Sequence, residues 1–121
     1  MDKHLKGVFF LEVKMKVSIL GTEYTIQKIS KKDDTSLNTC DGYCDKTSKR
    51  IVVTTDNGDL DDFEVYQKKI MRHEIIHAFL YESGLWENFK HDTWGHDETM
   101  IDWIAVQFPK MLNVFAEVDC L

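Results

Sequence analysis

Apolar and polar residues alternate along the first third of the chain in the way that half-buried β-strands require. From residue 13 to residue 19 every second residue is apolar, and the residues between them are Lys or Ser. Residues 24–27 alternate again after a Gly-containing segment at residues 20–23. Because alternation of period two places apolar side chains on one face, the two segments predict a β-hairpin.

Two further short strands are expected before the pattern changes. Residues 42–45 and 50–54 have strand character and flank a polar turn at residues 46–49. Residues 30–39 are polar and predict a loop or a short helix. The first half of the chain therefore predicts a small, mostly antiparallel sheet of three to four strands.

A long helix is predicted from about Asp62 to Ser83, because no Gly or Pro interrupts this segment. Asp61 and Glu64 have the spacing of an N-terminal capping box, and Gly84 follows as a C-terminal cap. The second half of the helix has little polar surface, so we expect it to be buried nearly all round. Polar side chains in that half then need partners.

A second helix is predicted from about Asp97 to Val118. Pro109 lacks a backbone donor and is expected to bend this helix or split it in two. Its apolar face consists of Met100, Ile101, Ile104, Phe108, Met111, Leu112 and Phe115. The fold class is α+β, in a single domain over residues 1–121, with residues 1–12 as a tail or an edge strand.

Composition narrows the range of partners. The net charge of -6 argues against general nucleic-acid binding, which needs an excess of Lys and Arg. No apolar run is long enough to span a membrane, and the N-terminal segment does not read as a signal peptide. Three cysteines without a secretion signal favour a reduced, cytoplasmic setting. Cys40 and Cys44 are predicted to be small buried or half-buried thiols and not metal ligands. The sequence leaves the oligomeric state open.

The first predicted helix carries His73-Glu74-Ile75-Ile76-His77, a His-Glu-x-x-His pattern. Residues four apart lie on one face of a helix, so both imidazoles can bind one Zn²⁺. Glu74 is then placed to act as general base towards a water molecule. Zinc also satisfies polar groups that are otherwise costly to bury. The pattern therefore predicts a zinc site with hydrolytic chemistry.

Catalytic zinc normally has a third protein ligand. Leu80 and Ser83 occupy the positions of Gly and His in the three-histidine extension of this motif, which excludes that class. Glu98 is the favoured third ligand, with His96 and then His91 as alternatives. Asp102 lies one turn beyond Glu98 and is predicted to accept the free N–H of a ligand histidine.

These residues carry a resemblance to a known group. Asp97-Glu98-x-x-x-Asp102 resembles the Asn-Glu-x-x-x-Asp segment of gluzincins, with Asp in place of Asn. Residues 71–85, 102–105 and 42–45 resemble small zincin-like proteins of phages and integrative elements, which are related to the ImmA/IrrE metallopeptidases. The resemblance implies a minimal zincin-like domain: a small sheet, an active-site helix and a second helix that bears a ligand.

The resulting hypothesis is a zinc metallo-endopeptidase that acts on a peptide or protein substrate. Zn²⁺ is held by His73, His77 and Glu98, and Glu74 moves the proton. One alternative is a catalytically weak or inactive zinc-binding regulatory or assembly module of a phage or mobile element. Another is a hydrolase of non-peptide amides. The group that stabilises the oxyanion is left open among Tyr43, Tyr66, Tyr81, His91 and His96.

Overall fold

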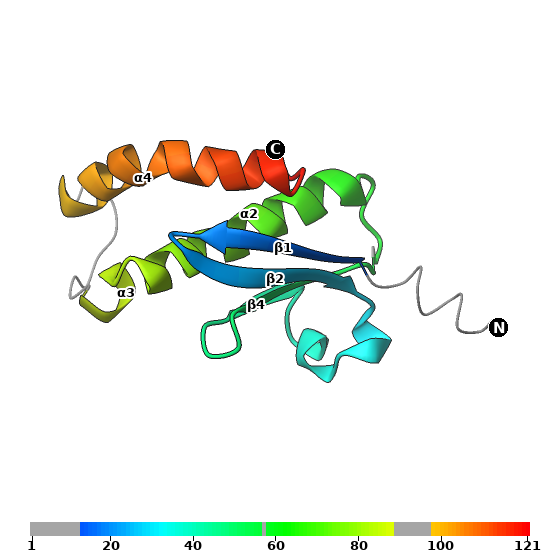
Figure 1. Cartoon of the computed structure of the whole chain (residues 1–121). Helices are drawn as coiled ribbons and strands as arrows, with labels where there is room; N and C mark the ends of the chain where they lie inside the picture. Colours follow the sequence, from blue (N-terminus) through cyan, green and yellow to red (C-terminus); the bar gives the residue numbers. More distant parts are fainter. Residues whose placement is uncertain (1–12, 57, 89–97) are drawn as a thin grey trace.

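The structure is a computed structural model that describes residues 13–56, 58–88 and 98–121. It has an α+β architecture in which a four-stranded sheet precedes two long helices (Figure 1). The predicted tail or edge strand over residues 1–12 lies outside the described residues. The elements are β1 (Val13–Ile19), β2 (Thr22–Ile29), η1 (Lys31–Asp33), η2 (Thr35–Asn38), β3 (Gly42–Asp45), β4 (Arg50–Thr54), α2 (Phe63–Glu82), α3 (Leu85–Asn88) and α4 (Glu98–Glu117).

The sheet is mixed, with strand order β1-β2-β4-β3. β1 and β2 form the predicted antiparallel hairpin, in which Val17 pairs with Tyr24. β3 and β4 are also antiparallel, whereas β2 and β4 run parallel. The predicted hairpin and strands are therefore confirmed, and one parallel pairing makes the sheet mixed. β3 lies at an edge of the sheet.

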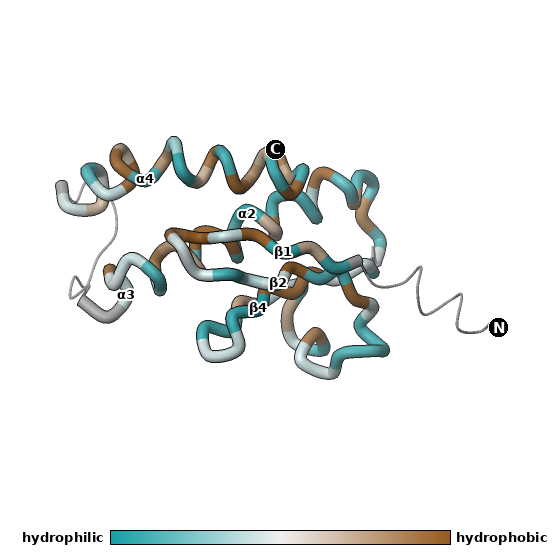
Figure 2. Tube along the Cα trace, viewed as in Figure 1, coloured by the Kyte–Doolittle hydropathy of each residue, from teal (hydrophilic) through white to brown (hydrophobic). Residues whose placement is uncertain are grey.

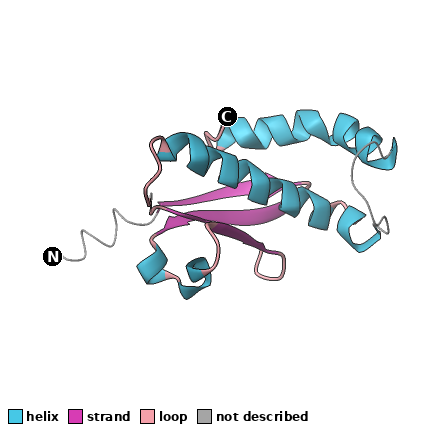
Figure 3. Ribbon diagram, turned by 180° about the vertical axis from the view of Figure 1, so that it is seen from behind, coloured by secondary structure: helices cyan, strands magenta, loops and turns pink. Residues whose placement is uncertain are grey.

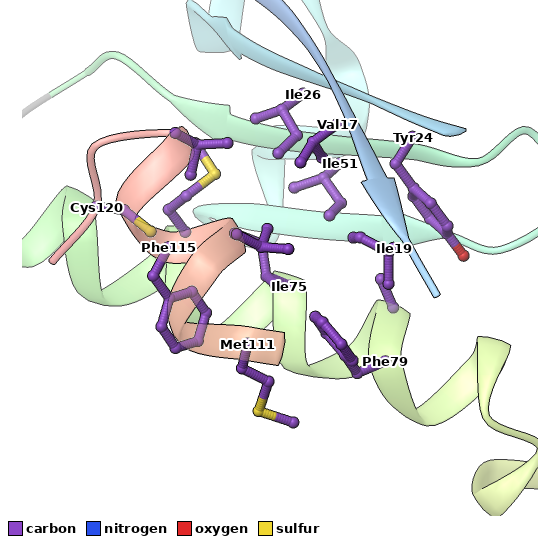
Figure 4. Packing of buried hydrophobic residues seen from close by; sticks show 14 of the residues in the cluster. Val17, Ile19, Tyr24, Ile26, Ile51, Ile75, Phe79, Met111, Phe115 and Cys120 are labelled. Carbon is purple, nitrogen blue, oxygen red and sulfur yellow. The ribbon is translucent and has the colours of Figure 1, made fainter. Parts of the chain in front are cut away.

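One face of the sheet is covered by α2 and α4, as the view from behind shows (Figure 3). Alternate side chains of the central strands enter this core, and Ile75 and Phe79 of α2 meet Met111 and Phe115 of α4 there (Figure 4). The opposite face carries a smaller cluster, in which Val52 packs with Leu37 of η2. Both layers follow from the period-two alternation of the strands.

The first helix begins one residue later than its predicted cap. Asp62, not Asp61, is the N-cap, and its Oδ1 accepts a hydrogen bond from the Val65 amide at 3.2 Å. The prediction of Asp61 was wrong because the adjacent Asp62 offers the same capping chemistry and directly precedes the first helical residue, Phe63. At the other end Gly84 has a φ of 80°, the left-handed conformation expected of a C-terminal glycine.

The second half of α2 is not buried nearly all round, contrary to the prediction. Glu74, Ile75, Ala78, Phe79 and Leu80 are buried. His73 is exposed, however, and Ile76 is 39 % exposed. The helix covers the sheet with one side only, and apolar content alone does not reveal which side remains open.

The second helix departs from prediction in two ways. Pro109 lies inside one continuous helix, so the alternative of two separate helices is wrong. Hydrophobic positions recur along all of α4 (Figure 2), yet only its C-terminal half packs deeply into the core, through Met111, Val114, Phe115 and Val118. The predicted face residues Ile104, Phe108 and Leu112 are exposed. No helix within the described ranges is long and apolar enough to cross a membrane.

Candidate functional site

Two imidazole rings converge on the exposed side of α2. The Nε2 atoms of His73 and His77 lie 3.2 Å apart, with ring centroids separated by 4.9 Å. Two nitrogens bound to one tetrahedral zinc at 2.0–2.1 Å lie about 3.3 Å from each other. The pair therefore fits a shared metal ion without rearrangement, and the same distance also suits a hydrogen bond between two neutral rings.

His77 is held by aromatic neighbours on the same side of the molecule. Its ring stacks on Tyr81 with centroids 6.2 Å apart, and Trp86 meets it edge-on at 6.3 Å. Burial lowers the pKa of His77, and the neighbouring His73 lowers it further. The lowered pKa keeps the imidazole in the neutral form that binds metals.

Glu74 is the buried carboxyl of the site, with only 8 % of its surface exposed. Burial raises the pKa of Glu74, while the adjacent His73 opposes that shift. No hydrogen bond from any described residue reaches its carboxyl group. A carboxyl whose pKa is raised in this way holds a proton more readily than a free carboxyl, which suits a group that accepts and then releases a proton.

Gly42 lets β3 approach α2 closely beside Glu74. A Cβ atom on Gly42 would lie 2.6 Å from Cγ2 of Ile70 and 3.0 Å from the carbonyl oxygen of Val52. It would also lie 3.5 Å from Cγ of Glu74, which places that side chain against the strand. A cavity of about 360 Å³ opens where this strand begins, and His73 and Glu74 line it together with Asp41 and Lys69.

The third ligand stays a prediction. Glu98 is the first residue of α4, but its side chain, like His91 and His96, lies outside the described part of the structure. Among described side chains, no group of three or more His, Cys, Asp and Glu is arranged to hold a metal ion. The two histidines thus form a half-site that fits zinc and needs ligands from elsewhere.

The predicted contact between Asp102 and a ligand histidine is not made by the described residues. Asp102 is exposed on α4. Nδ1 of His77 is buried and has no hydrogen-bond partner among the described residues. A buried imidazole nitrogen without a partner is costly, so this atom is open to an acceptor that the described residues do not supply.

The three tyrosines proposed as oxyanion donors differ in what their hydroxyls do. The Tyr43 hydroxyl donates to Asp34 at 2.6 Å and accepts from Arg50, and the Tyr66 hydroxyl donates to Asp41 at 2.6 Å. The Tyr81 hydroxyl has no hydrogen bond to a described residue. Tyr81 is therefore the described tyrosine whose hydroxyl is free to bind another group.

The thiols behave as the sequence predicts. Cys40 and Cys44 are half-buried, Cys120 is buried, and all three are free. Burial raises the pKa of Cys44 to about 12 and that of Cys120 to about 11. Neither group is a thiolate at neutral pH.

Sequence reasoning missed the network beside the cavity. Asp41 accepts hydrogen bonds from Lys31 at 2.7 Å and from Tyr66 at 2.6 Å, across separations of 10 and 25 residues. No local pattern signals such contacts. The nearest available signal was Gly42 at the start of a strand, because an isolated strand glycine often marks a close backbone approach.

No protein-family model, no curated protein and no solved structure matches the chain. The resemblance to small zincin-like proteins therefore rests on the motif residues themselves.

Proposed function

We propose that the protein is a zinc-dependent hydrolase of peptide bonds, with a minimal zincin-like fold. The observation that carries the proposal is the 3.2 Å separation of the His73 and His77 Nε2 atoms directly beside the buried carboxyl of Glu74. This arrangement combines two metal ligands with a proton acceptor whose pKa is raised by burial.

The residues divide the reaction between them. His73 and His77 bind the metal, and Glu98 is the favoured third ligand, with His96 and His91 as alternatives. Zinc, when bound, supplies a Lewis acid that activates water and polarises the carbonyl. Glu74 takes a proton from the water, whose oxygen adds to the carbonyl carbon, and delivers that proton to the leaving amine as the C–N bond breaks.

Tyr81 is the described residue best placed to donate to the oxyanion. Its ring stacks on His77, and its hydroxyl has no other described partner. Lys46, just beyond β3, lies 5.4 Å from the centre of the same ring, while Gly42 at the start of β3 lies against Glu74. β3 and α2 thus run side by side in the same direction past the site. Among the described strands β3 pairs on one side only, with β4, so its other edge offers backbone groups to an extended peptide.

Zinc content and hydrolysis of a peptide mixture, followed by mass spectrometry, test the proposal. Glu74→Gln should retain zinc and lose about 10²- to 10⁴-fold in rate, because it removes the proton acceptor only. His73→Ala and His77→Ala should lose both zinc and activity. Glu64→Gln, in the exposed first turn of the same helix, is the matched control and should behave as wild type. Unchanged hydrolysis by Glu74→Gln would refute the mechanism.

A second function is favoured by the exposed apolar side chains of α4. Ile104, Val106 and Phe108 are 47 %, 63 % and 51 % exposed, which suits a zinc-binding interaction module. The same measurements separate the two functions. A module binds zinc with high affinity and leaves every peptide intact, with Glu74→Gln indistinguishable from wild type.

A further inference from the structure

The cavity beside Glu74 is built from the start of β3 and the middle of α2. Gly42 and Ile70 form its apolar part, and Tyr66 adds an aromatic wall. Gly42 lets β3 pack closely on Ile70, and the cavity lies beside this contact, with Gly42, His73 and Glu74 in its lining. A substrate group next to the bond at Glu74 would therefore enter this space.

The negative charge of Asp41 at this cavity is already neutralised. Its Oδ1 accepts a 2.7 Å bond from Nζ of Lys31, and its Oδ2 accepts a 2.6 Å bond from the Tyr66 hydroxyl. Lys31 is itself fixed by the carbonyl oxygens of Leu37 and Cys40, at 3.0 and 3.2 Å. These partners keep the pKa of Asp41 low, so the carboxylate stays charged and paired. A basic substrate group would have to compete with Lys31 for it.

Unlike Asp41, Lys69 carries a charge that no described residue neutralises. It lines the cavity, its side chain is exposed, and it forms no ion pair or hydrogen bond with a described residue. It lies one helical turn before His73, on the cavity side of α2. The neighbouring Lys68 instead lines a separate small cavity with Met71 and Cys120, beside the end of α4. Apart from Glu74, Lys69 is thus the charged group of this cavity that no described residue neutralises.

We propose that this cavity binds a carboxylate group of the substrate next to the scissile bond, and that Lys69 determines this specificity. The inference rests on the proposed peptide hydrolysis. The carboxylate comes from an acidic side chain or from the C-terminus of a peptide, two sources with the same chemistry. Since Lys69 is exposed, the ion pair should give a moderate preference of about threefold to tenfold.

The test begins with the cleavage sites that the zinc-loaded protein selects in a peptide mixture. Peptides based on one site then carry Glu, Gln or Lys next to the cleaved bond, with free or amidated C-termini. Wild type should cleave Glu peptides about threefold to tenfold faster in kcat/KM than Gln peptides, and Lys peptides slowest. An effect of amidation in place of the side-chain effect would identify the C-terminus as the source.

Charge reversal provides the decisive comparison. Lys69→Glu should invert the order and favour Lys peptides, while Lys69→Met should cleave Glu and Gln peptides equally. Lys68→Glu makes the same charge change on the adjacent residue and should keep the wild-type order. Zinc content should be equal in all variants. A Lys69→Glu protein that still prefers Glu peptides would overturn the assignment.

Binding separates failure of this inference from failure of the proposed function. Fluorescein-labelled peptides of one fixed sequence that carry either Glu or Gln, chosen without reference to cleavage, are titrated with the Glu74→Gln protein, and binding is followed by fluorescence anisotropy. The Glu peptide should bind about threefold to tenfold more tightly, less so at high salt. Suppose that the wild type cleaves no peptide, that Glu74→Gln still binds the Glu peptide more tightly, and that Glu74→Gln/Lys69→Glu reverses this preference. In that case only the proposed hydrolysis is wrong. Equal binding of both peptides would overturn the carboxylate site itself.

Discussion

The two long helices have the same length, 20 residues each, but they pack against the core over different parts of their lengths. α2 lies along the sheet and buries side chains from Ile70 to Leu80. α4 buries its C-terminal half, whereas Ile104 and Phe108 in the middle of the helix are exposed. The hydrophobic core therefore fixes the helix that carries His73 and His77.

The start of α4 is held differently. Trp103 donates a hydrogen bond from its indole N–H to Oγ of Ser83 at 3.2 Å, near the end of α2. Met100 is also buried. These contacts bring the predicted ligand-bearing turn towards the end of α2, but among the described side chains fewer buried residues hold this turn than hold the middle of α2. We therefore expect metal binding to stabilise the start of α4 more than it stabilises α2.

Truncating one phenylalanine in each helix should reveal the largest difference in stability between α2 and α4. Phe79 on α2 is 1 % exposed, and Phe108 on α4 is 51 % exposed. Phe79→Ala should lower the free energy of unfolding by about 3–5 kcal/mol, because it leaves a cavity in the core. Phe108→Ala should change it by less than about 0.5 kcal/mol in urea denaturation. Similar losses at both positions would show that α4 is covered in solution.

Zinc should stabilise the whole protein and act unevenly on the helices. At a free zinc concentration of 100 times Kd, the free energy of unfolding should rise by about 2.7 kcal/mol. Hydrogen exchange should slow most at the start of α4, because α2 is already fixed by the core. His77→Ala should abolish both effects. If zinc slowed hydrogen exchange equally in both helices, the expectation that the core already fixes α2 would be contradicted.

Adding a methyl group at Gly42 should change the free energy of unfolding somewhat less than zinc binding does. Gly42→Ala is expected to lower the free energy of unfolding by about 1–3 kcal/mol, since its Cβ would overlap Ile70 and approach the Val52 carbonyl. The penalty should shrink when it is measured in an Ile70→Ala background, which removes the Cγ2 atom. An unchanged penalty in that double-mutant cycle would assign the strain to the backbone.

The smallest expected effect is the pH dependence of the metal-free protein. Burial lowers the pKa of His77 below 6.5, so the unfolded chain binds the proton more readily than the folded one. This contribution to stability is complete above pH 6.5 and is lost as the pH falls through that value towards the folded pKa. His77→Gln should flatten this slope in urea denaturation between pH 5 and 7. An unchanged slope would assign it to another group.

Local patterns were enough to predict most elements but not how the helices use their surfaces. Alternation predicted the hairpin, and strand-forming residues around a polar turn predicted both later strands, because each signal depends on neighbouring residues alone. Ile76 and Phe108 looked like core residues, yet they are exposed, since their burial depends on elements distant in sequence. The capping aspartate was misplaced by one residue for the opposite reason, because two adjacent residues offered the same local interaction.

The same limit applies to the site. Spacing alone predicted that His73 and His77 share a helix face, and the 3.2 Å separation of their Nε2 atoms confirms that they converge. The pairing of Asp41 with Lys31 and Tyr66 comes from the packing of a loop on a helix, and no motif encodes it. The predicted third ligand, Glu98, belongs to a different helix, so its position also depends on packing that no local pattern encodes.

The unequal burial of the three thiols offers a way to observe the cavity in solution. Cys44 and Cys120 stay protonated at neutral pH, because burial raises their pKa values to about 12 and about 11. Cys40 is half-buried and lines the cavity, and its Sγ donates a hydrogen bond to the carbonyl oxygen of Ser36 at 3.3 Å. A maleimide fluorophore should therefore label the natural sequence mainly at Cys40, where its emission would report each time a ligand enters or leaves.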